Sequence, residues 1–217
     1  MKNTKVIIEI ALVAVIIVLG VLVYRTIVTP MRFEDECNRR RDAVVEKLKT
    51  IRTLQEAYKI TYNCYAGDLD SLVIKLKNGQ TSMVKRDVLK KVPEDMTEAE
   101  AIKQGYIKID TIRVNALEKL RNEHKIDSTL TDEDLMNLKY IPGTNHTEQF
   151  ECNAGSIERS GMQVSVFEVK VHFRTLLKDL DKQMVENKIA EIERNAEKYA
   201  GWKIGDMNNP ITDGNFE

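Results

Sequence analysis

Hydrophobic residues are distributed unevenly along the chain, and the longest apolar run lies close to its N-terminus. Residues 6–24 are apolar apart from Glu9. A helix rises about 1.5 Å per residue, so this run extends roughly 28 Å and matches the hydrocarbon core of a bilayer. Backbone groups inside a bilayer must pair within their own segment, which requires a helix. We therefore predict a transmembrane helix that Thr29 and Pro30 close.

The run is expected to stay attached and to act as an anchor. Arg25, Thr26 and Ile27 follow it, so the small-residue cleavage site of a secretory signal is missing. Lysine and arginine counts favour a cytoplasmic C-terminal side. A short N-terminal tail is nevertheless easily retained, and large domains translocate largely regardless of charge. We expect the N-terminus on the cytoplasmic side, a single pass through the membrane, and the C-terminal domain on the opposite side.

Glu9 is the one charged residue within the apolar run. It lies near the N-terminal end of the run, and Lys5 precedes it by one helical turn on the same face. One interpretation is a carboxylate that reaches the interface and pairs with Lys5. The functional interpretation is that Glu9 neutralises the amine of a neighbouring subunit in an assembly.

Apolar residues spaced by three and four predict a long amphipathic helix over residues 34–62. Its stripe needs a partner, which is either the protein's own sheet or, as in a coiled coil, a second copy. The assembly candidates on this stripe are Val44, Leu48, Ile51, Leu54 and Tyr58.

Two shorter helices are marked by signals at their ends. Asp68 is a favoured N-cap before an apolar stripe, and Gly79 ends that segment. Thr97 and Glu100 have the spacing of a capping box, and we expect their helix to end before Gly105.

A further amphipathic helix is expected over residues 177–199, with Gly201 as its stop. The segment from Trp202 onward is rich in Asn and Gly, which predicts a loosely held tail. Residues 115–130 are highly charged and fit neither a helix nor a strand pattern well.

Two segments have strand character. Residues 106–114 alternate, and residues 147–173 carry the strongest β pattern, with a Ser-Gly pair at 160–161 between two arms. The alternation changes phase at 166–167, which predicts a bulge. The expected fold is therefore α+β: a transmembrane helix continues into a long amphipathic helix, which packs with additional helices on a small antiparallel sheet. The predicted parts are the tail and anchor (1–30), a helical stalk (31–66), the α+β domain (67–205) and a flexible tail (206–217).

Composition narrows the functional class. The chain has 217 residues, 42% hydrophobic and 31% charged, which excludes a disordered chain. Its net charge of −1 gives no basic excess of the kind that nucleic-acid binding requires. Nucleophile elbows, phosphate-binding loops and dinucleotide or metal motifs are missing, and the three histidines stand far apart. We therefore expect no enzyme activity, no cofactor and no metal. The expected partners are the lipid bilayer and either other proteins or further copies of this chain.

The three cysteines form no CxxC pair. In an oxidising compartment one disulfide is a candidate, between Cys64, which follows a helix, and Cys152, which lies in a predicted strand. The alternative is that all three are free, buried thiols.

The anchor with Glu9, followed by an amphipathic helix that runs into LQEAYKITYNCYAGDLDSL (residues 54–72), resembles type IV pilins and pseudopilins. The resemblance implies an envelope subunit whose long N-terminal helix packs its second half on an antiparallel sheet. It also implies that Glu9 corresponds to the glutamate that sets helix register in that family. No Gly-Phe peptidase site precedes the apolar run.

Segments 48–72, 92–105, 138–143 and 166–171 resemble a family of uncharacterised single-pass bacterial envelope proteins, for which no activity is assigned. The resemblance implies that the membrane is the bacterial inner membrane and that the C-terminal domain is periplasmic. Together these features predict a membrane-anchored, non-enzymatic envelope protein with a pilin-like or scaffold role. The alternative is a membrane-tethered ligand-binding or sensing domain, which requires a closed pocket with convergent polar groups.

Overall fold

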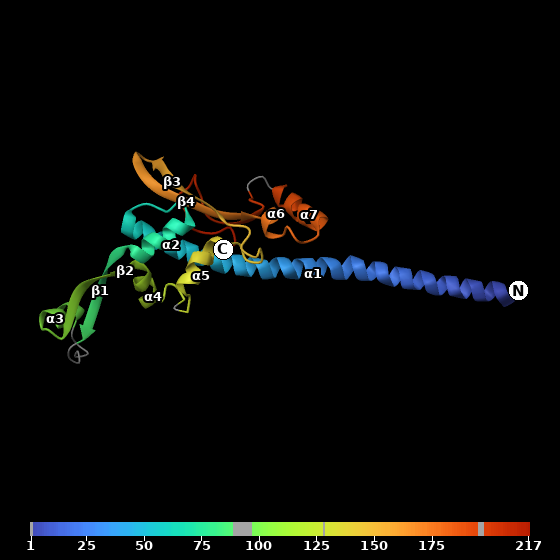
Figure 1. Cartoon of the computed structure of the whole chain (residues 1–217), viewed down its shortest axis with the longest axis horizontal. Coiled ribbons are helices and arrows are strands. Elements are labelled where there is room, and N and C mark those ends of the chain that lie inside the picture. Colours follow the sequence, from blue (N-terminus) through green and yellow to red (C-terminus); the bar gives the residue numbers. More distant parts are fainter. Residues whose placement is uncertain (1, 89–96, 128, 195–197) are drawn as a thin grey trace.

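The structure is a computed structural model that combines one very long helix with a mixed helical and sheet domain (Figure 1). It describes residues 2–88, 97–127, 129–194 and 198–217, with the side chains of these residues except 2–8, 83–88, 98 and 99.

The long helix, α1 (Lys2–Tyr62), is continuous over 61 residues and contains Pro30. The expected end at Thr29 and Pro30 is therefore wrong. A proline within a helix removes one backbone hydrogen bond, here the one to the carbonyl of Thr26. The remaining hydrogen bonds of the turns on both sides keep the helix continuous through this position. The helix ends where Asn63 adopts a left-handed conformation (φ 58°) and donates its N–H to the Lys59 carbonyl at 2.8 Å.

The two halves of α1 have different surroundings. The first half extends alone from the domain, whereas the domain elements surround the second half (Figure 1). Leu48, Ile51 and Leu54 are completely buried at this second half. The predicted amphipathic stripe therefore packs on the chain's own domain.

The helix α2 (Leu69–Asn78) confirms its predicted end signals. The Asp68 carboxylate accepts the N–H of Ser71 at 2.8 Å, and the helix ends at Gly79. Gln55 holds the segment between α1 and α2. It is fully buried, and its side-chain amide exchanges hydrogen bonds of 2.8 and 2.9 Å with the backbone C=O and N–H of Ala66.

An antiparallel ribbon of two strands, β1 (Gln80–Val88) and β2 (Ile107–Asn115), follows α2. The helix α3 (Glu98–Lys103) comes between the two strands in the sequence and has the predicted capping box of Thr97 and Glu100. The pattern predicted β2 but missed β1, whose sequence does not alternate cleanly. The ribbon and α3 extend from the end of the domain that is far from the N-terminus (Figure 1).

Three short helical segments connect the ribbon to the second sheet. The helix α4 (Ala116–Asn122) resolves the ambiguous segment, because the Asn115 side chain caps it by accepting the N–H of Leu117. The helix α5 (Asp132–Met136) and the 3-10 helix η1 (Asn137–Lys139) come next.

The second sheet is antiparallel, with the order β3 (Glu151–Arg159), β4 (Met162–His172) and β5 (Gly201–Gly205). The predicted turn at 160–161 joins β3 and β4, and both of its residues have positive φ angles of 51° and 77°. Such angles at both central positions match the twist of a tight hairpin.

The predicted bulge at 166–167 is wrong. Gly155 pairs with Val166 and Ala154 with Phe167, so the register continues through this point. Val166 and Phe167 are both buried, although neighbouring side chains in a strand point to opposite faces. The phase change arises because β4 is the central strand and both of its faces are covered here.

The helix expected over residues 177–199 is shorter than predicted, because α7 begins only at Lys182 (Lys182–Glu193). A separate short helix, α6 (Phe173–Leu176), lies just before the predicted range. The Asp181 carboxylate caps α7 by accepting the N–H of Met184 at 3.0 Å. The linker between the two helices therefore ends at Asp181. The sequence did not reveal this end, because the apolar spacing continues through the linker.

The segment from Trp202 onward is not the loose tail that its composition predicts. It begins with β5, and the chain then folds back so that Ile204 pairs with Gly214. Asn215 donates its N–H to the carbonyl of Lys203 at 3.1 Å, and its side chain also bonds to this edge. The final residues thus cover the outer edge of β5, and Glu217 accepts a hydrogen bond from Arg52 at 2.7 Å.

Candidate functional site

The first half of α1 is an exposed apolar surface. The large apolar side chains between residues 10 and 27 are 53–65% exposed. Among the described residues, α1 is the one helix that is long and apolar enough to cross a membrane. A contiguous apolar surface of this size is unfavourable in water and marks an interaction with lipid or protein. This half of α1 is therefore a candidate membrane span.

Glu9 is exposed at the start of this surface. Its predicted pairing with Lys5 concerns a side chain outside the described part of the chain. At the other end of the surface, Arg32 reaches back along the helix and donates to the Tyr24 hydroxyl at 3.4 Å. Tyrosine and arginine concentrate where a membrane helix meets the lipid headgroups, because each combines an apolar body with a polar end.

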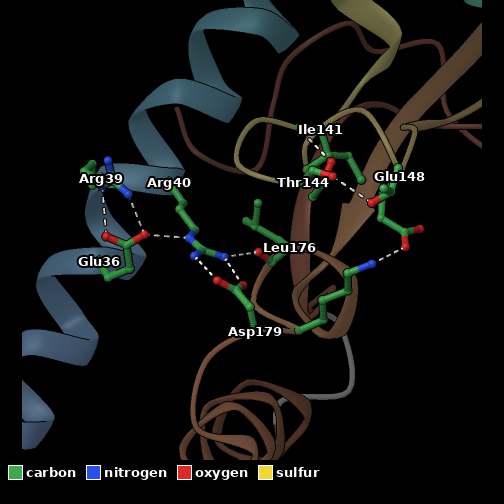
Figure 2. Close-up of polar contacts among 10 residues, drawn as sticks. Glu36, Arg39, Arg40, Ile141, Thr144, Glu148, Leu176 and Asp179 are labelled. Carbon is green, nitrogen blue, oxygen red and sulfur yellow. Dashed lines mark hydrogen bonds and ion pairs between the residues drawn. The ribbon is translucent and has the colours of Figure 1, made fainter.

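A buried arginine joins α1 to the linker between α6 and α7 (Figure 2). Arg40 is 9% exposed. Its guanidinium donates to both carboxylate oxygens of Asp179 at 2.6 and 2.7 Å and to the Leu176 carbonyl at 2.7 Å. It also donates to Glu36 at 2.8 Å, one turn earlier on α1. A planar guanidinium can make such a two-pronged contact, whereas a lysine cannot.

The same cluster shifts the ionisation of its acids. Hydrogen bonds from Arg39 and Arg40 lower the pKa of Glu36 to about 2. The hydrogen bond from Arg40 lowers the pKa of Asp179. Both carboxylates are consequently charged at neutral pH. These ion pairs join two segments that are far apart in the sequence, and we call Glu36, Arg40 and Asp179 together the clasp. The clasp contains no group able to accept a proton near pH 7.

The linker has a second polar attachment. Lys178, next to Asp179, donates to the Glu148 carboxylate at 2.5 Å. Glu148 belongs to a tight turn in which the Thr144 hydroxyl donates to the Ile141 carbonyl at 2.8 Å (Figure 2). The α6–α7 linker is thus held between α1 and this turn.

Glu9 and Lys5 are the other two assembly candidates; the five on the stripe over residues 34–62 lie together on α1, but in the core. Val44, Leu48, Ile51 and Leu54 are 0% exposed, and Tyr58 is 4% exposed. The chain's own domain covers them all, so this stripe offers no surface to a second copy. The exposed apolar surface of α1 is the first half, not the predicted stripe.

The cysteines are free thiols in the structure. Cys64 is exposed, whereas Cys152 lies against Gln55 and the carbonyl of Ala66. Burial raises the pKa of Cys152 to about 12 and also raises the pKa of Cys37. The buried Cys37 and the half-buried Cys152 are therefore protonated at neutral pH.

The histidines have separate roles. His172 caps α6 by accepting the N–H of Arg174 at 3.1 Å, and its ring contacts Tyr199 edge-on. The His146 ring lies against Tyr140. Within the described ranges, no histidine hydrogen-bonds to a serine or cysteine, and His, Cys, Asp and Glu form no group suited to holding a metal.

A groove beside Trp202 is a feature that the sequence did not predict. One cavity of about 190 Å³ lies between α1 and the α6–α7 segment. A second, of about 380 Å³, lies between the end of α7 and β5. Both are lined by Phe173, Ile192 and Trp202, so they adjoin. We call the two cavities together the Trp202 groove.

Comparison of the chain with known protein families, with curated proteins and with solved structures finds no match. The function must therefore be argued from the exposed helix, the clasp and the groove.

Proposed function

We propose that this protein is a membrane-anchored, non-enzymatic scaffold or assembly subunit of a bacterial cell envelope. The observation that carries this proposal is the contrast along α1, whose first half is apolar and exposed while its second half is buried. In this proposal the first half crosses the inner membrane once, and the domain stands on the periplasmic side.

The continuity of α1 supports a fixed position for the domain. Because the helix runs without a break from the apolar half into the core, the domain cannot turn freely about a loop. Glu34 and Arg40, which contact α7 and the α6–α7 linker, lie about 13 and 22 Å beyond Arg25 at roughly 1.5 Å per residue. The domain would thus begin shortly above the lipid headgroups.

Assembly in this proposal uses the exposed half of α1. The core stripe is occupied, so helix-to-helix contacts between copies would involve the apolar residues on either side of Gly20 and the carboxylate of Glu9. A subunit of this kind would be pilin-like in architecture. Its domain would then be free to bind a protein partner.

Alkaline carbonate extraction of membranes tests the anchor. We expect the full chain to remain in the membrane pellet. Replacing both Val15 and Leu19 by arginine should release it, because each arginine near the centre of a bilayer costs about 2.5–3.5 kcal/mol on insertion scales. Replacing Ile60 by arginine is the matched control, since Ile60 is an exposed apolar residue on the domain half of the same helix. A wild-type chain in the supernatant would reject the proposal.

Crosslinking in intact membranes tests the assembly. Single cysteines at Val15, Leu19 or Leu22, in a chain whose native cysteines are replaced, should give dimers with an oxidant at native abundance. A cysteine at Ile60 should give none. Monomers alone at all four positions would exclude helix-mediated assembly while leaving the anchor intact.

The second candidate function, a tethered ligand-binding domain, is favoured by one observation, the Trp202 groove. It predicts saturable binding of a small molecule by single copies of the protein, whether or not the chain assembles.

A further inference from the structure

The Trp202 groove has the volume of a small-molecule site. Its two cavities, of about 190 and 380 Å³, fall together within the range of about 300–1,000 Å³ that is typical of ligand pockets. The groove lies between α1, α6, α7 and β5, which are rigid elements. Of the domain elements, α6 and α7 lie nearest to the N-terminal half of α1 (Figure 1).

The floor of the groove is apolar. Phe173, Leu176 and Leu177 form its base and are 1–3% exposed. Trp202 is half-buried and meets the Phe173 ring edge-to-face at a centroid distance of 5.4 Å. A floor of this kind favours a hydrocarbon chain or ring over a polar ligand.

The rim of the groove is mainly cationic. Its four positive residues are Arg41, Lys188, Lys198 and Lys203. Glu34 is the one acidic lining residue, and it pairs with Lys188 at 2.9 Å. Arg41 pairs with an acid outside the lining, Asp42, at 3.0 Å. Lys203 pairs with two, Asp206 at 3.1 Å and Glu168 at 3.6 Å. Lys198 is exposed, and none of the described residues makes a hydrogen bond or ion pair with it.

We propose that the groove binds a single-chain amphiphilic anion of the acyl carboxylate class. The chain would lie on the Phe173 and Trp202 floor, and the carboxylate would sit at the Lys198 end of the rim. A simple inorganic anion would not contact the half-buried Trp202 ring, and an uncharged hydrocarbon would not use the cation. This inference goes beyond the scaffold role and rests on the groove alone.

Trp202 provides the probe, because it is the only tryptophan in the chain. Bromine quenches tryptophan fluorescence only near contact. The groove begins on α1 at Glu34, which lies about 13 Å beyond Arg25 at about 1.5 Å per residue, and extends away from the apolar half to Arg41. Brominated lipids that stay in the bilayer are therefore too far away to quench Trp202.

The test uses the full chain in nanodiscs of phosphatidylcholine at pH 8, without detergent. It is titrated with dodecanoate brominated at its terminal carbon, and in parallel with the matching brominated dodecanol. We expect saturable quenching by the carboxylate, with a Kd at least tenfold lower than that of the alcohol. Equal Kd values, or no saturable quenching by the carboxylate, would overturn the proposal. So would quenching by acyl-brominated phosphatidylcholine, because Trp202 would then lie in the lipid.

Two lysine variants locate the anionic end. Lys198→Gln should raise the Kd for the brominated carboxylate about three- to tenfold and leave that for the alcohol unchanged. Lys182→Gln is the control, because Lys182 lies on α7 outside the groove lining. Equal effects of the two substitutions would show that only overall charge matters and would reject the assigned rim.

Discussion

The Arg40 guanidinium and the Asp179 carboxylate join positions 139 residues apart through two parallel hydrogen bonds of 2.6 and 2.7 Å. The arginine side chain is 10% exposed and the aspartate side chain 57% exposed, so the pair lies at the edge of the core. It fixes the α6–α7 linker on α1 at the end of the domain nearest to the apolar half. The position of the α6–α7 linker on α1 therefore depends on this contact.

Removing the arginine should destabilise the domain. We expect Arg40→Gln to lower the free energy of unfolding by about 1.5–3 kcal/mol, because hydrogen bonds to charged groups are lost and the Leu176 carbonyl loses its donor. Arg39→Gln is the control, since Arg39 is 78% exposed and should leave the free energy of unfolding nearly unchanged. Urea unfolding of the full chain in nanodiscs, followed by Trp202 fluorescence, measures both. Equal losses would contradict the role given to Arg40.

The clasp should also make stability depend on acid pH. The pKa of Glu36 falls from 4.5 to about 2 in the folded protein, and that of Asp179 falls below 3.8. The folded state therefore binds fewer protons than the unfolded state, so this stabilisation is complete above about pH 4.5 and is lost as the pH falls towards 2. The urea midpoint should decrease between pH 5 and pH 3. Glu36→Gln should show a smaller decrease, and an unchanged slope would be evidence against the clasp.

Gln55 should matter through the two backbone groups that it satisfies. Gln55→Leu leaves the buried N–H and C=O of Ala66 without those partners, at about 1–3 kcal/mol for each group. Gln163→Leu, at an exposed position of β4, should change stability by less than about 0.5 kcal/mol. Thermal unfolding by circular dichroism compares the two. A Gln55→Leu variant as stable as the wild type would show that Gln55 is not needed to hold this segment.

Leucine truncation should separate the two halves of α1. Leu48→Ala removes a fully buried side chain and should lower domain stability by about 2–5 kcal/mol. Leu19→Ala, at a side chain that is 54% exposed, should leave the unfolding of the domain unchanged. The same urea experiment in nanodiscs measures both variants. A comparable loss for Leu19→Ala would place that residue in the folded core.

Local signals in the sequence predicted much of the fold. Asp68, the capping box at Thr97 and Glu100, and the turn at 160–161 all have short-range causes, namely hydrogen bonds and φ angles within a few residues. The apolar run and the long stripe were equally clear, because a helix repeats every 3.6 residues. These features give the α+β class and the helical order of the first half.

Long-range contacts account for what the sequence could not reveal. Asp181 ends the linker that Arg40 holds, and the final residues pair with β5 although Asn and Gly dominate their composition. The Trp202 groove gathers residues from α1, α7 and β5, which are far apart in the chain. The stripe itself did not say whether its partner was another copy or the chain's own domain. Its burial answers that question.

The depth of α1 in a bilayer tests the central claim most directly. Nitroxide labels at Leu19→Cys and Lys49→Cys, in a full chain with Cys37, Cys64 and Cys152 replaced by alanine, would be compared in nanodiscs by their collisions with oxygen and with a water-soluble nickel complex. We expect oxygen to dominate at position 19 and the nickel complex at position 49. A label at position 19 that collides mainly with nickel would place the apolar half in water and contradict the anchor.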